Sequence, residues 1–364
     1  MGGREVFTER LSTSLLGLLG AGHEVVIFGS AQTPESPVHS RHTTESGIEL
    51  HRFNLDSFGR PPQNPGEPSV LSSLRNVANE FAPDVIHLHN FYSQSSVFLT
   101  SYLRASGKKI PTIYTIHDVA TLSKIPDSLG GEIVGNATDA IVCPSRYIYE
   151  RLETQKGIGQ KKVVIIENGV PDRGTISRES SESLRVFSAA NLHNHKGFVI
   201  LLTAWAKISR QFPGGKLTLA GDGPEKNFLQ DYCVKLGISN SVEFLGWLKD
   251  EELSRELSNH SMVVVPSLVA EAFGLVAAEA QMSGLPVIAS AIGGLKEIVE
   301  DGKTGILCSA GSVSELSVAL SSLMSNSPLR SSMGFAARER ALRMFDMNTC
   351  TSKYLRLYES LIAV

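Results

Sequence analysis

Short apolar runs alternate with longer amphipathic stretches along nearly the whole chain of 364 residues. Runs of this kind, rich in Val, Ile and Leu and bounded by turn residues, are typical of buried strands in a parallel sheet. In the first half we expect strands at 24–29, 48–54, 84–89, 112–117, 140–144 and 163–167. In the second half we expect them at 185–190, 216–220, 242–246, 262–266 and 286–290. Helical stretches lie between most of them, so the fold class is α/β with parallel sheets.

Two helices near the ends of the chain follow from apolar residues at helical spacing. The first has its apolar face at Phe7, Leu11, Leu15 and Leu18. Acidic residues flank this segment, which argues against a signal peptide. After Asp346, an amphipathic helix is indicated by Tyr354, Leu355, Tyr358 and Leu361.

Chain length predicts two domains. Residues 173–183 are polar, rich in serine and without periodicity, which is typical of a linker between domains. We therefore expect a first domain at 1–172, a second at 184–346 and a terminal helix at 347–364.

Composition excludes several classes of protein. The net charge of −3 gives no general attraction to nucleic acid or to an anionic membrane. The four cysteines are scattered, which indicates reduced core thiols in the cytoplasm and neither a zinc site nor a disulfide framework. No apolar run is long enough to predict a transmembrane segment.

Two glutamates define the strongest candidate site. Glu271 follows the strand at 262–266, and Glu279 lies about two turns into a helix expected at 273–282. Open α/β sheets bind ligands at the carboxyl ends of their strands. Apolar neighbours surround Glu279, so its carboxylate needs a partner. A Phe-Gly pair opens the helix and lets the backbone approach a ligand closely.

A cationic loop precedes another expected helix. Lys196 stands at the start of that helix, where a positive charge is unfavourable unless an anion binds there. Asn191 in the same loop offers hydrogen bonds without charge. His193 and His195 either add positive charge when protonated or are ordinary loop residues, and the sequence leaves both interpretations open.

The residues 267–279, together with 220–224, 301–307 and 22–25, resemble the donor-site motifs of retaining glycosyltransferases of the GT-B fold, specifically family 4 with its Glu-x7-Glu motif. The resemblance covers nearly the whole chain. It implies two Rossmann-like domains with parallel sheets facing a central cleft, and a C-terminal helix that crosses back to the first domain.

The resemblance also implies residue roles. Lys196 would contact the donor diphosphate, Glu271 the hydroxyls of the donor sugar, and Glu279 the ribose hydroxyls. His117, at the end of an expected strand, would lie on the acceptor side with Asp118 orienting it. Further donor contacts would come from Gly2, Gly3, Asn191, Gly221, Gly223, Phe273, Gly274 and Leu275. Trp247 would lie near the nucleobase, although core packing is the favoured interpretation.

The activity implied is transfer of a hexose from a UDP- or GDP-sugar to a hydroxyl acceptor, with retention, in polysaccharide or glycoconjugate biosynthesis. The acceptor would be a sugar, a lipid-linked sugar or a small molecule, selected by loops of the first domain such as 58–66. No cofactor or metal is expected, since the chain has no Asp-x-Asp pair and no cluster accompanies His87 and His89. The expected location is the cytoplasm, with the inner face of the membrane as the alternative for a lipid acceptor.

Two alternatives remain open at this stage. A nucleotide-sugar 2-epimerase would share the fold and the donor but would use no acceptor. A non-catalytic partner subunit would keep the fold and lose donor contacts. Asn191, which stands where many relatives carry Arg, favours the second alternative, whereas Lys196, Glu271 and Glu279 disfavour it.

The beginning of the chain departs from the resembled pattern. Met1 is followed at once by Gly2 and Gly3, so the glycine loop is present without the strand that normally precedes it. Such a strand would be central in a doubly wound sheet. We expect an upstream segment that encodes an apolar strand, and without it the neighbouring strands would have exposed edges.

Overall fold

The computed structural model describes residues 3–19, 23–30, 39–44, 47–53, 70–89, 110–117, 119, 138–154, 162–172, 174 and 184–363. The chain divides into two compact units. The first comprises Met1–Pro144, Tyr149–Ile166 and Cys350–Val364, and the second comprises Ser145–Ile148 and Glu167–Thr349. All but one residue of the expected linker, and the whole loop 58–66, lie outside the described residues.

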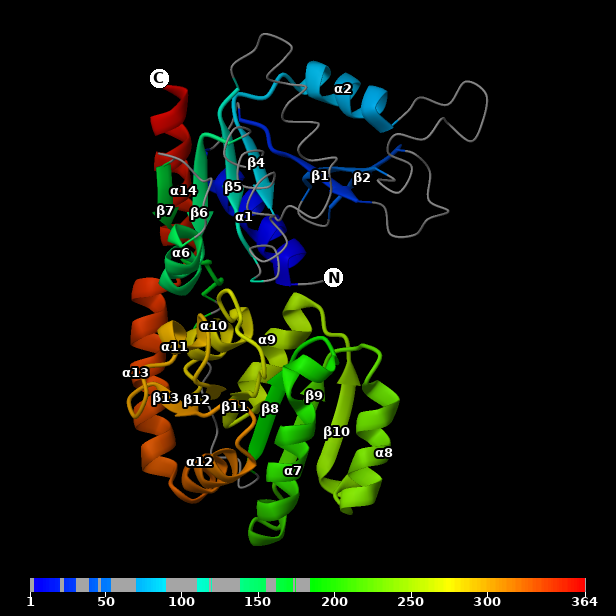
Figure 1. The fold of residues 1–364 in the computed structure, drawn as a ribbon, viewed down its shortest axis with the longest axis vertical. Helices are drawn as coiled ribbons and strands as arrows, with labels where there is room; N and C mark the ends of the chain where they lie inside the picture. Colours follow the sequence, from blue (N-terminus) through cyan, green and yellow to red (C-terminus); the bar gives the residue numbers. More distant parts are fainter. Residues whose placement is uncertain are drawn as a thin grey trace. The chain divides into compact units, whose positions relative to one another are not determined.

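The first unit contains two sheets and the helices around them (Figure 1). Its elements are α1 (Gly3–Leu19), β1 (Val26–Ser30), β2 (His39–Thr43), β3 (Glu49–Phe53), α2 (Val70–Phe81), β4 (Ile86–His89), β5 (Thr112–Thr115), β6 (Ala140–Cys143), the part of α6 (Arg146–Glu153) from Tyr149 on, β7 (Lys162–Ile165) and most of α14 (Met347–Ile362). One sheet has the order β1-β3-β2 and the other β4-β5-β6-β7. Among the described residues, β1 and β4 are edge strands of separate sheets.

The C-terminal helix α14 is anchored in the first unit by hydroxyl groups. The ring of His87 on β4 bonds the Tyr358 hydroxyl through Nδ1 and the Thr115 hydroxyl through Nε2, both at 2.7 Å. Thr115 also pairs with the hydroxyl of Tyr354, which is fully buried. Burial holds the pKa of His87 well below its usual value, so this imidazole is uncharged at neutral pH. The predicted return of the terminal helix to the first unit is confirmed.

The second unit is a doubly wound α/β unit (Figure 1). Its elements are β8 (Arg185–Ala189), α7 (Phe198–Ile208), β9 (Lys216–Ala220), α8 (Lys226–Leu236), β10 (Val242–Gly246), α9 (Asp250–Asn259), β11 (Met262–Val265), α10 (Leu275–Met282), β12 (Val287–Ser290), α11 (Leu295–Ile298), β13 (Gly305–Cys308), α12 (Val313–Ser325) and α13 (Ser327–Met344). The parallel strands have the order β10-β9-β8-β11-β12-β13. In chain order this is 3-2-1-4-5-6, with the direction of winding reversing between β8 and β11.

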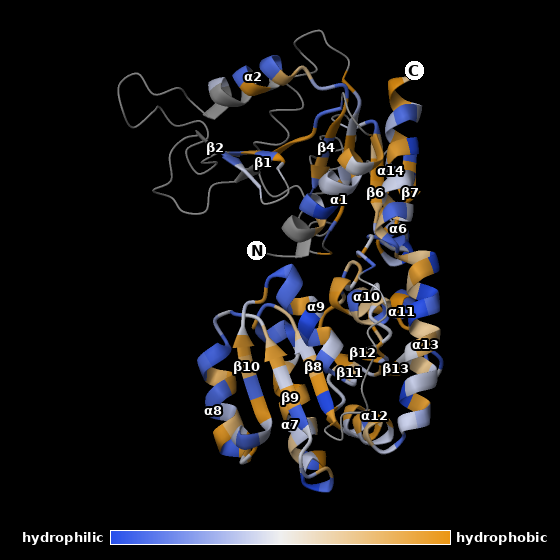
Figure 2. Cartoon of the chain, turned by 180° about the vertical axis from the view of Figure 1, so that it is seen from behind, coloured by the Kyte–Doolittle hydropathy of each residue, from blue (hydrophilic) through white to orange (hydrophobic). Residues whose placement is uncertain are grey.

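Each face of this sheet carries its own apolar core. Leu201 and Trp205 of α7 pack with Leu320 of α12 on one face. Ala277 of α10 and Phe345 belong to the core on the other face. Figure 2 shows apolar residues gathered on the strands and polar residues along the outer sides of α8 and α13. The sheet is therefore covered on both faces, and only its strand ends remain open to ligands.

The predicted elements agree closely with the observed ones. Each of the eleven expected strands forms, within one or two residues at most ends. The helix expected from residue 273 begins at Leu275, after Gly274 has turned the chain. In α1 the side chains of Phe7, Leu11 and Leu15 are buried, whereas Leu18 is exposed. The sequence did not predict β2 and β13.

One buried histidine makes the stability of the second unit depend on pH. His260 is 2% exposed, and its Nδ1 lies against the Glu256 carbonyl oxygen while Nε2 faces the Thr218 hydroxyl. A carbonyl oxygen only accepts, so Nδ1 carries the proton. Burial lowers the pKa of His260 to about 4 from an ordinary value of 6.5.

We predict that acidification from pH 7 to pH 4 destabilises the second unit by about 3 kcal/mol through His260, because the unfolded chain binds a proton there and the folded chain does not. Replacing the residue (His260→Gln) should lower stability at pH 7 and flatten the pH dependence in this window. Both tryptophans, Trp205 and Trp247, lie in the second unit, so urea unfolding followed by their fluorescence measures it directly. Parallel pH curves for the two proteins would contradict the prediction.

Candidate functional site

Two loops meet where the winding of the second sheet reverses. One follows β8 and leads through a short 3-10 helix (Asn194–Lys196) and Gly197 into α7. The other follows β11. Gly197 has a left-handed backbone (φ 74°), and a Cβ there would lie 1.9 Å from the Pro266 carbonyl oxygen. The Leu268 amide donates to the His195 carbonyl at 2.8 Å. The loops therefore touch backbone to backbone.

These loops bring Lys196 and Glu271 together. Lys196 Nζ donates to Glu271 Oε1 at 2.7 Å, and the side chains are 22% and 18% exposed. The Ser267 hydroxyl donates to the same Oε1. Burial raises the pKa of Glu271, but the charge of Lys196 and the hydrogen bonds from Lys196 and Ser267 outweigh it, so the net pKa is below the usual value. Glu271 is thus ionised at neutral pH beside a cation.

The backbone of Glu271 is held by the turn after β12. Gly294 donates its amide to the Glu271 carbonyl at 2.8 Å, and a Cβ on Gly293 would lie 2.5 Å from that same oxygen. The Ser145 hydroxyl donates to the next carbonyl, that of Ala272, at 2.6 Å. The loop that carries Glu271 therefore has fixed partners on either side of it.

Helix α10 supplies the second glutamate. Gly274 caps the helix and Leu275 is its first residue. Glu279 is 9% exposed, in agreement with the expected burial. Phe273 is 4% exposed and packs edge to face on Phe345, with ring centroids 5.5 Å apart. Its side chain belongs to the core, so only its backbone remains as a candidate ligand contact.

A third loop, after β9, lies against the β8 loop. The Leu192 amide donates to the Asp222 carbonyl at 2.9 Å, and a Cβ on Gly221 would lie 1.9 Å from the Ala190 carbonyl oxygen. Gly223 follows in the same turn, with Leu192 backbone atoms as its nearest neighbours. Asn191, between the two contacts, is exposed. The three loops form one connected edge of the sheet.

The structure corrects the favoured interpretation of Trp247. This residue follows β10 directly and is 44% exposed, so it is not a core side chain. Its position after Gly246 places the exposed indole at the carboxyl end of the sheet, on the same edge as the three loops. The general tendency of tryptophan to be buried misled the sequence interpretation, because exposure depends on where the strand ends.

Of the two loop histidines, His195 does not add the positive charge that the sequence left open for it. The rings of His193 and His195 stack with centroids 5.5 Å apart. Burial, followed by the charge of Lys196, lowers the pKa of His195. His195 is therefore neutral at pH 7, and Lys196 is the cation of this loop that contacts Glu271.

In the first unit, His117 lies just after β5 and has a partner that the sequence did not indicate. Its Nε2 pairs with His89 Nδ1 at 2.8 Å, so one of the two rings donates a proton to the other. The ring of Phe7 packs 5.4 Å from His117, centroid to centroid. Asp118 and Gly2 lie outside the described residues. Gly3 is the first residue of α1, whereas the sequence placed it in a loop.

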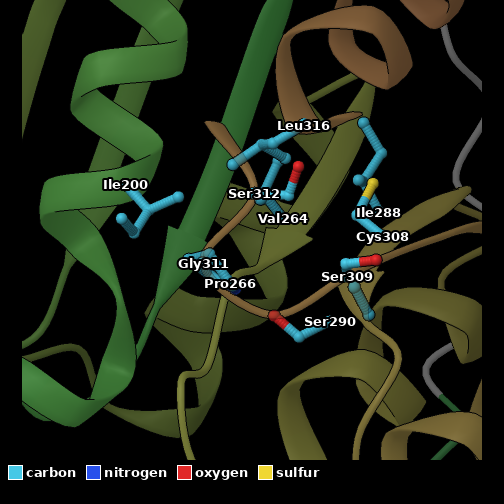
Figure 3. Close-up of a pocket in the computed structure, with 11 residues that line it drawn as sticks. Ile200, Val264, Pro266, Ile288, Ser290, Cys308, Ser309, Gly311, Ser312 and Leu316 are labelled. Atoms are coloured by element: carbon cyan, nitrogen blue, oxygen red, sulfur yellow. The ribbon is translucent and has the colours of Figure 1, made fainter. Parts of the chain in front are cut away.

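A small pocket lies beside these loops on the second unit, with Pro266 in its lining (Figure 3). Figure 3 shows it among the ends of β11, β12 and β13, with Ile200 on α7 and Leu316 on α12 facing it. It has room for about one water molecule. Neither Lys196 nor Glu271 lines it, so we assign the candidate site to the charged loops instead.

The described residues contain no group of three or more His, Cys, Asp or Glu side chains placed to hold a metal ion. None of the described helices is long and apolar enough to cross a membrane.

The strand order and the loops at its point of reversal define a nucleotide-binding type of α/β unit. Comparison with known proteins specifies the class further. The model "Glycosyl transferases group 1" matches residues 175–340, and "Glycosyltransferase Family 4" matches residues 1–173. The chain is a glycosyltransferase of the GT-B type.

Relatives and solved structures agree with this class. The glycogen synthase of Mycobacterium tuberculosis is 26% identical over 98% of this chain and 91% of its own length. The N-acetyl-alpha-D-glucosaminyl L-malate synthase of Bacillus anthracis is 26% identical over 85% of this chain and 84% of its own. Sucrose-phosphate synthase from Thermosynechococcus elongatus superimposes with a TM-score of 0.81 at 22% identity, covering 100% of this chain and 94% of that one. Anabaena Alr3699/HepE, in complex with UDP and glucose, gives 0.77 at 19%, covering 99% and 96%.

We predict that the Gly293 turn is required to hold Glu271. An alanine there (Gly293→Ala) should cost about 3 kcal/mol, because its Cβ would press on the Glu271 backbone in addition to straining a left-handed residue (φ 53°). Gly302 is the matched control, since it is also left-handed (φ 73°) but has open space around it. Gly302→Ala should cost only about 1 kcal/mol. Equal losses in urea unfolding would show that Gly293 makes no special contact.

Proposed function

We propose that the protein transfers a hexose from a uridine diphosphate sugar to a hydroxyl acceptor, with retention of configuration at the anomeric carbon. The observation that carries this proposal is the Lys196–Glu271 pair at the reversal point of the second sheet. Two opposite charges on touching loops offer a cation for a diphosphate and an anion for sugar hydroxyls within one site.

Lys196 has the charge and the position for the donor diphosphate. It stands immediately before the N-terminus of α7, where the first amides of the helix are not used by the helix itself. A diphosphate there would receive both the lysine charge and the favourable end of the helix dipole. The same groups would stabilise the negative charge that builds up on the diphosphate as the glycosidic bond breaks.

The two glutamates have separate roles in this proposal. Glu271 accepts hydrogen bonds from hydroxyls of the transferred sugar, and Glu279 from those of the ribose. Glu271 offers its Oε2 for this purpose, because the bonds from Lys196 and Ser267 both go to Oε1. The glycine turns of Gly221 and Gly223 and the backbone at Gly274 and Leu275 border the nucleotide. Gly3 and Asn191 remain candidate donor contacts.

The chemistry needs no protein nucleophile. The acceptor hydroxyl attacks the anomeric carbon on the face from which the diphosphate leaves, and the leaving phosphate oxygen takes the hydroxyl proton. The C–O bond to the diphosphate breaks as the bond to the acceptor forms. We propose that His117 contacts the transferred sugar from the acceptor side, and that no divalent metal is required.

Glucose is the first sugar to test. Alr3699/HepE has been crystallised with UDP-glucose as well as with UDP and glucose, and the Mycobacterium relative is a glycogen synthase. By extension from these relatives we propose a role in polysaccharide or glycoconjugate biosynthesis. The acceptor class, whether a sugar, a lipid-linked sugar or a small molecule, would be set by the first unit.

We predict that UDP and UDP-glucose raise the melting temperature of the protein, whereas GDP and ADP do so less. Lys196→Ala should weaken UDP binding about 10- to 100-fold, the loss typical of a hydrogen bond to a charged group. Glu279→Ala should weaken it by about 10-fold through the ribose. Isothermal titration calorimetry at fixed salt measures each dissociation constant.

Lys216→Ala is the control for charge. Lys216 is exposed at the start of β9, at the other end of that strand from the site loops, and its Nζ donates to the Asn240 carbonyl at 2.6 Å, so its loss changes the net charge equally without touching the site. If both lysine variants bind UDP like the wild type, Lys196 is not the diphosphate contact. If the wild type binds GDP more tightly than UDP, the assignment of uracil as the donor's nucleobase is wrong, but a nucleotide-sugar donor is still supported.

We predict that the first sugar released from UDP-glucose has the α configuration of the donor. Slow transfer to water in the absence of an acceptor allows this to be followed by proton NMR before mutarotation. Initial release of β-glucose would rule out retention. Release of a 2-epimer would favour the epimerase alternative.

A further inference from the structure

A third side chain, that of Ser267, contacts the Lys196–Glu271 pair, and the proposed reaction assigns it no role of its own. Ser267 lies two residues beyond the end of β11 and is 1% exposed. Its hydroxyl donates to Glu271 Oε1, the oxygen that also receives Lys196 Nζ. One carboxylate oxygen is thus held from two different loops.

We propose that Ser267 is a positioning residue that holds Glu271 in place when the donor draws Lys196 away. This inference rests on the proposed function. A nucleoside diphosphate carries more negative charge than one carboxylate, so it competes for Lys196 and weakens or breaks the Lys196–Glu271 bond. The serine hydroxyl is then the remaining side-chain donor to Glu271 among the described residues.

Ser267 suits this role because its backbone is held in place by contacts on both sides. Its neighbours on both sides are fixed by the β8 loop: the Pro266 carbonyl lies against Gly197, and the Leu268 amide donates to the His195 carbonyl at 2.8 Å. The hydroxyl is buried and satisfied by the carboxylate. A donor on so rigid a backbone fixes the direction of the carboxylate as well as its charge.

Orientation matters because the two carboxylate oxygens have different tasks. With Oε1 bound to Ser267, Oε2 is the oxygen that can accept a sugar hydroxyl. Without the serine, a Glu271 side chain released by Lys196 can rotate, and its remaining charge is less stabilised. A hydrogen bond to the charged form lowers the pKa of a carboxyl group, so its loss raises that pKa.

The test is Ser267→Ala, assayed by release of UDP from UDP-glucose in water. We expect UDP to bind within about 2-fold of the wild type, because Lys196 is intact, and kcat to fall about 10-fold, the effect of one hydrogen bond to a charged group. In a plot of kcat against pH, the fall on the acid side should move to higher pH by about one unit, because Glu271 is protonated more easily. Lys196 and His195 are the other ionisable groups that act on Glu271, and both are retained in this variant.

Two further variants separate positioning from folding. Ser267→Thr keeps the hydroxyl and should restore the wild-type pH profile. Ser188→Ala is the matched control, because Ser188 is also 1% exposed and its hydroxyl donates to the Val264 carbonyl at 2.8 Å, outside the charged cluster. Its kcat and acid limb should stay at the wild-type values.

The outcomes distinguish this inference from the proposed function. Unchanged kcat and pH profile in Ser267→Ala, with an active wild type, would overturn the positioning role alone. An equal fall in Ser188→Ala would assign the effect to general loss of packing and would also overturn it. No UDP release and no UDP binding by the wild type would overturn the proposed function and this inference with it.

Discussion

The candidate site depends on backbone lying directly against backbone at the carboxyl edge of the second sheet. The Pro266 carbonyl oxygen lies 1.9 Å from the position of a Cβ on Gly197, and the Ala190 carbonyl oxygen lies 1.9 Å from that of a Cβ on Gly221. Loops that approach this closely leave no room for side chains between them, so charged groups beside them are held at short range. The 2.7 Å contact of Lys196 and Glu271 is a result of this packing. The ion pair also has a cost, because each partly buried charge must be compensated by the other.

In the protein without ligand, the charge of Lys196 is already compensated by Glu271. Glu271 occupies Lys196 in the way that an anionic ligand would, and a neutral His195 adds no second charge. Under the proposed function, donor binding exchanges one ionic partner of Lys196 for another and does not bury a bare lysine. The affinity for a nucleotide would then be the difference between two similar interactions, and the selectivity would depend on which of them is better oriented.

Most of the fold could be predicted from the sequence because its strands are buried on both faces. Continuous apolar runs such as 262–266 mark such strands directly. The strand β2 was missed because His39–Thr43 is polar and lies at the edge of its sheet, where pairing uses the backbone and leaves no apolar pattern. Lys196 and Glu271 were proposed from their positions at strand ends and from the family motifs, and the structure brings their side chains together. The bonds from Ser267 and from His89 could not be predicted, because sequence spacing carries no information on which side chains meet across loops or strands.

The C-terminal helix has a consequence for how the chain is made. Residues 350–364 complete the core of the first unit, where Tyr354 is fully buried and Thr351 bonds Ser14 near the start of the chain. The second unit, by contrast, is almost continuous from Glu167 to Thr349. During synthesis the second unit can therefore fold while the first unit still lacks residues 350–364. Translation that stops before residue 350 releases a first unit with an open core.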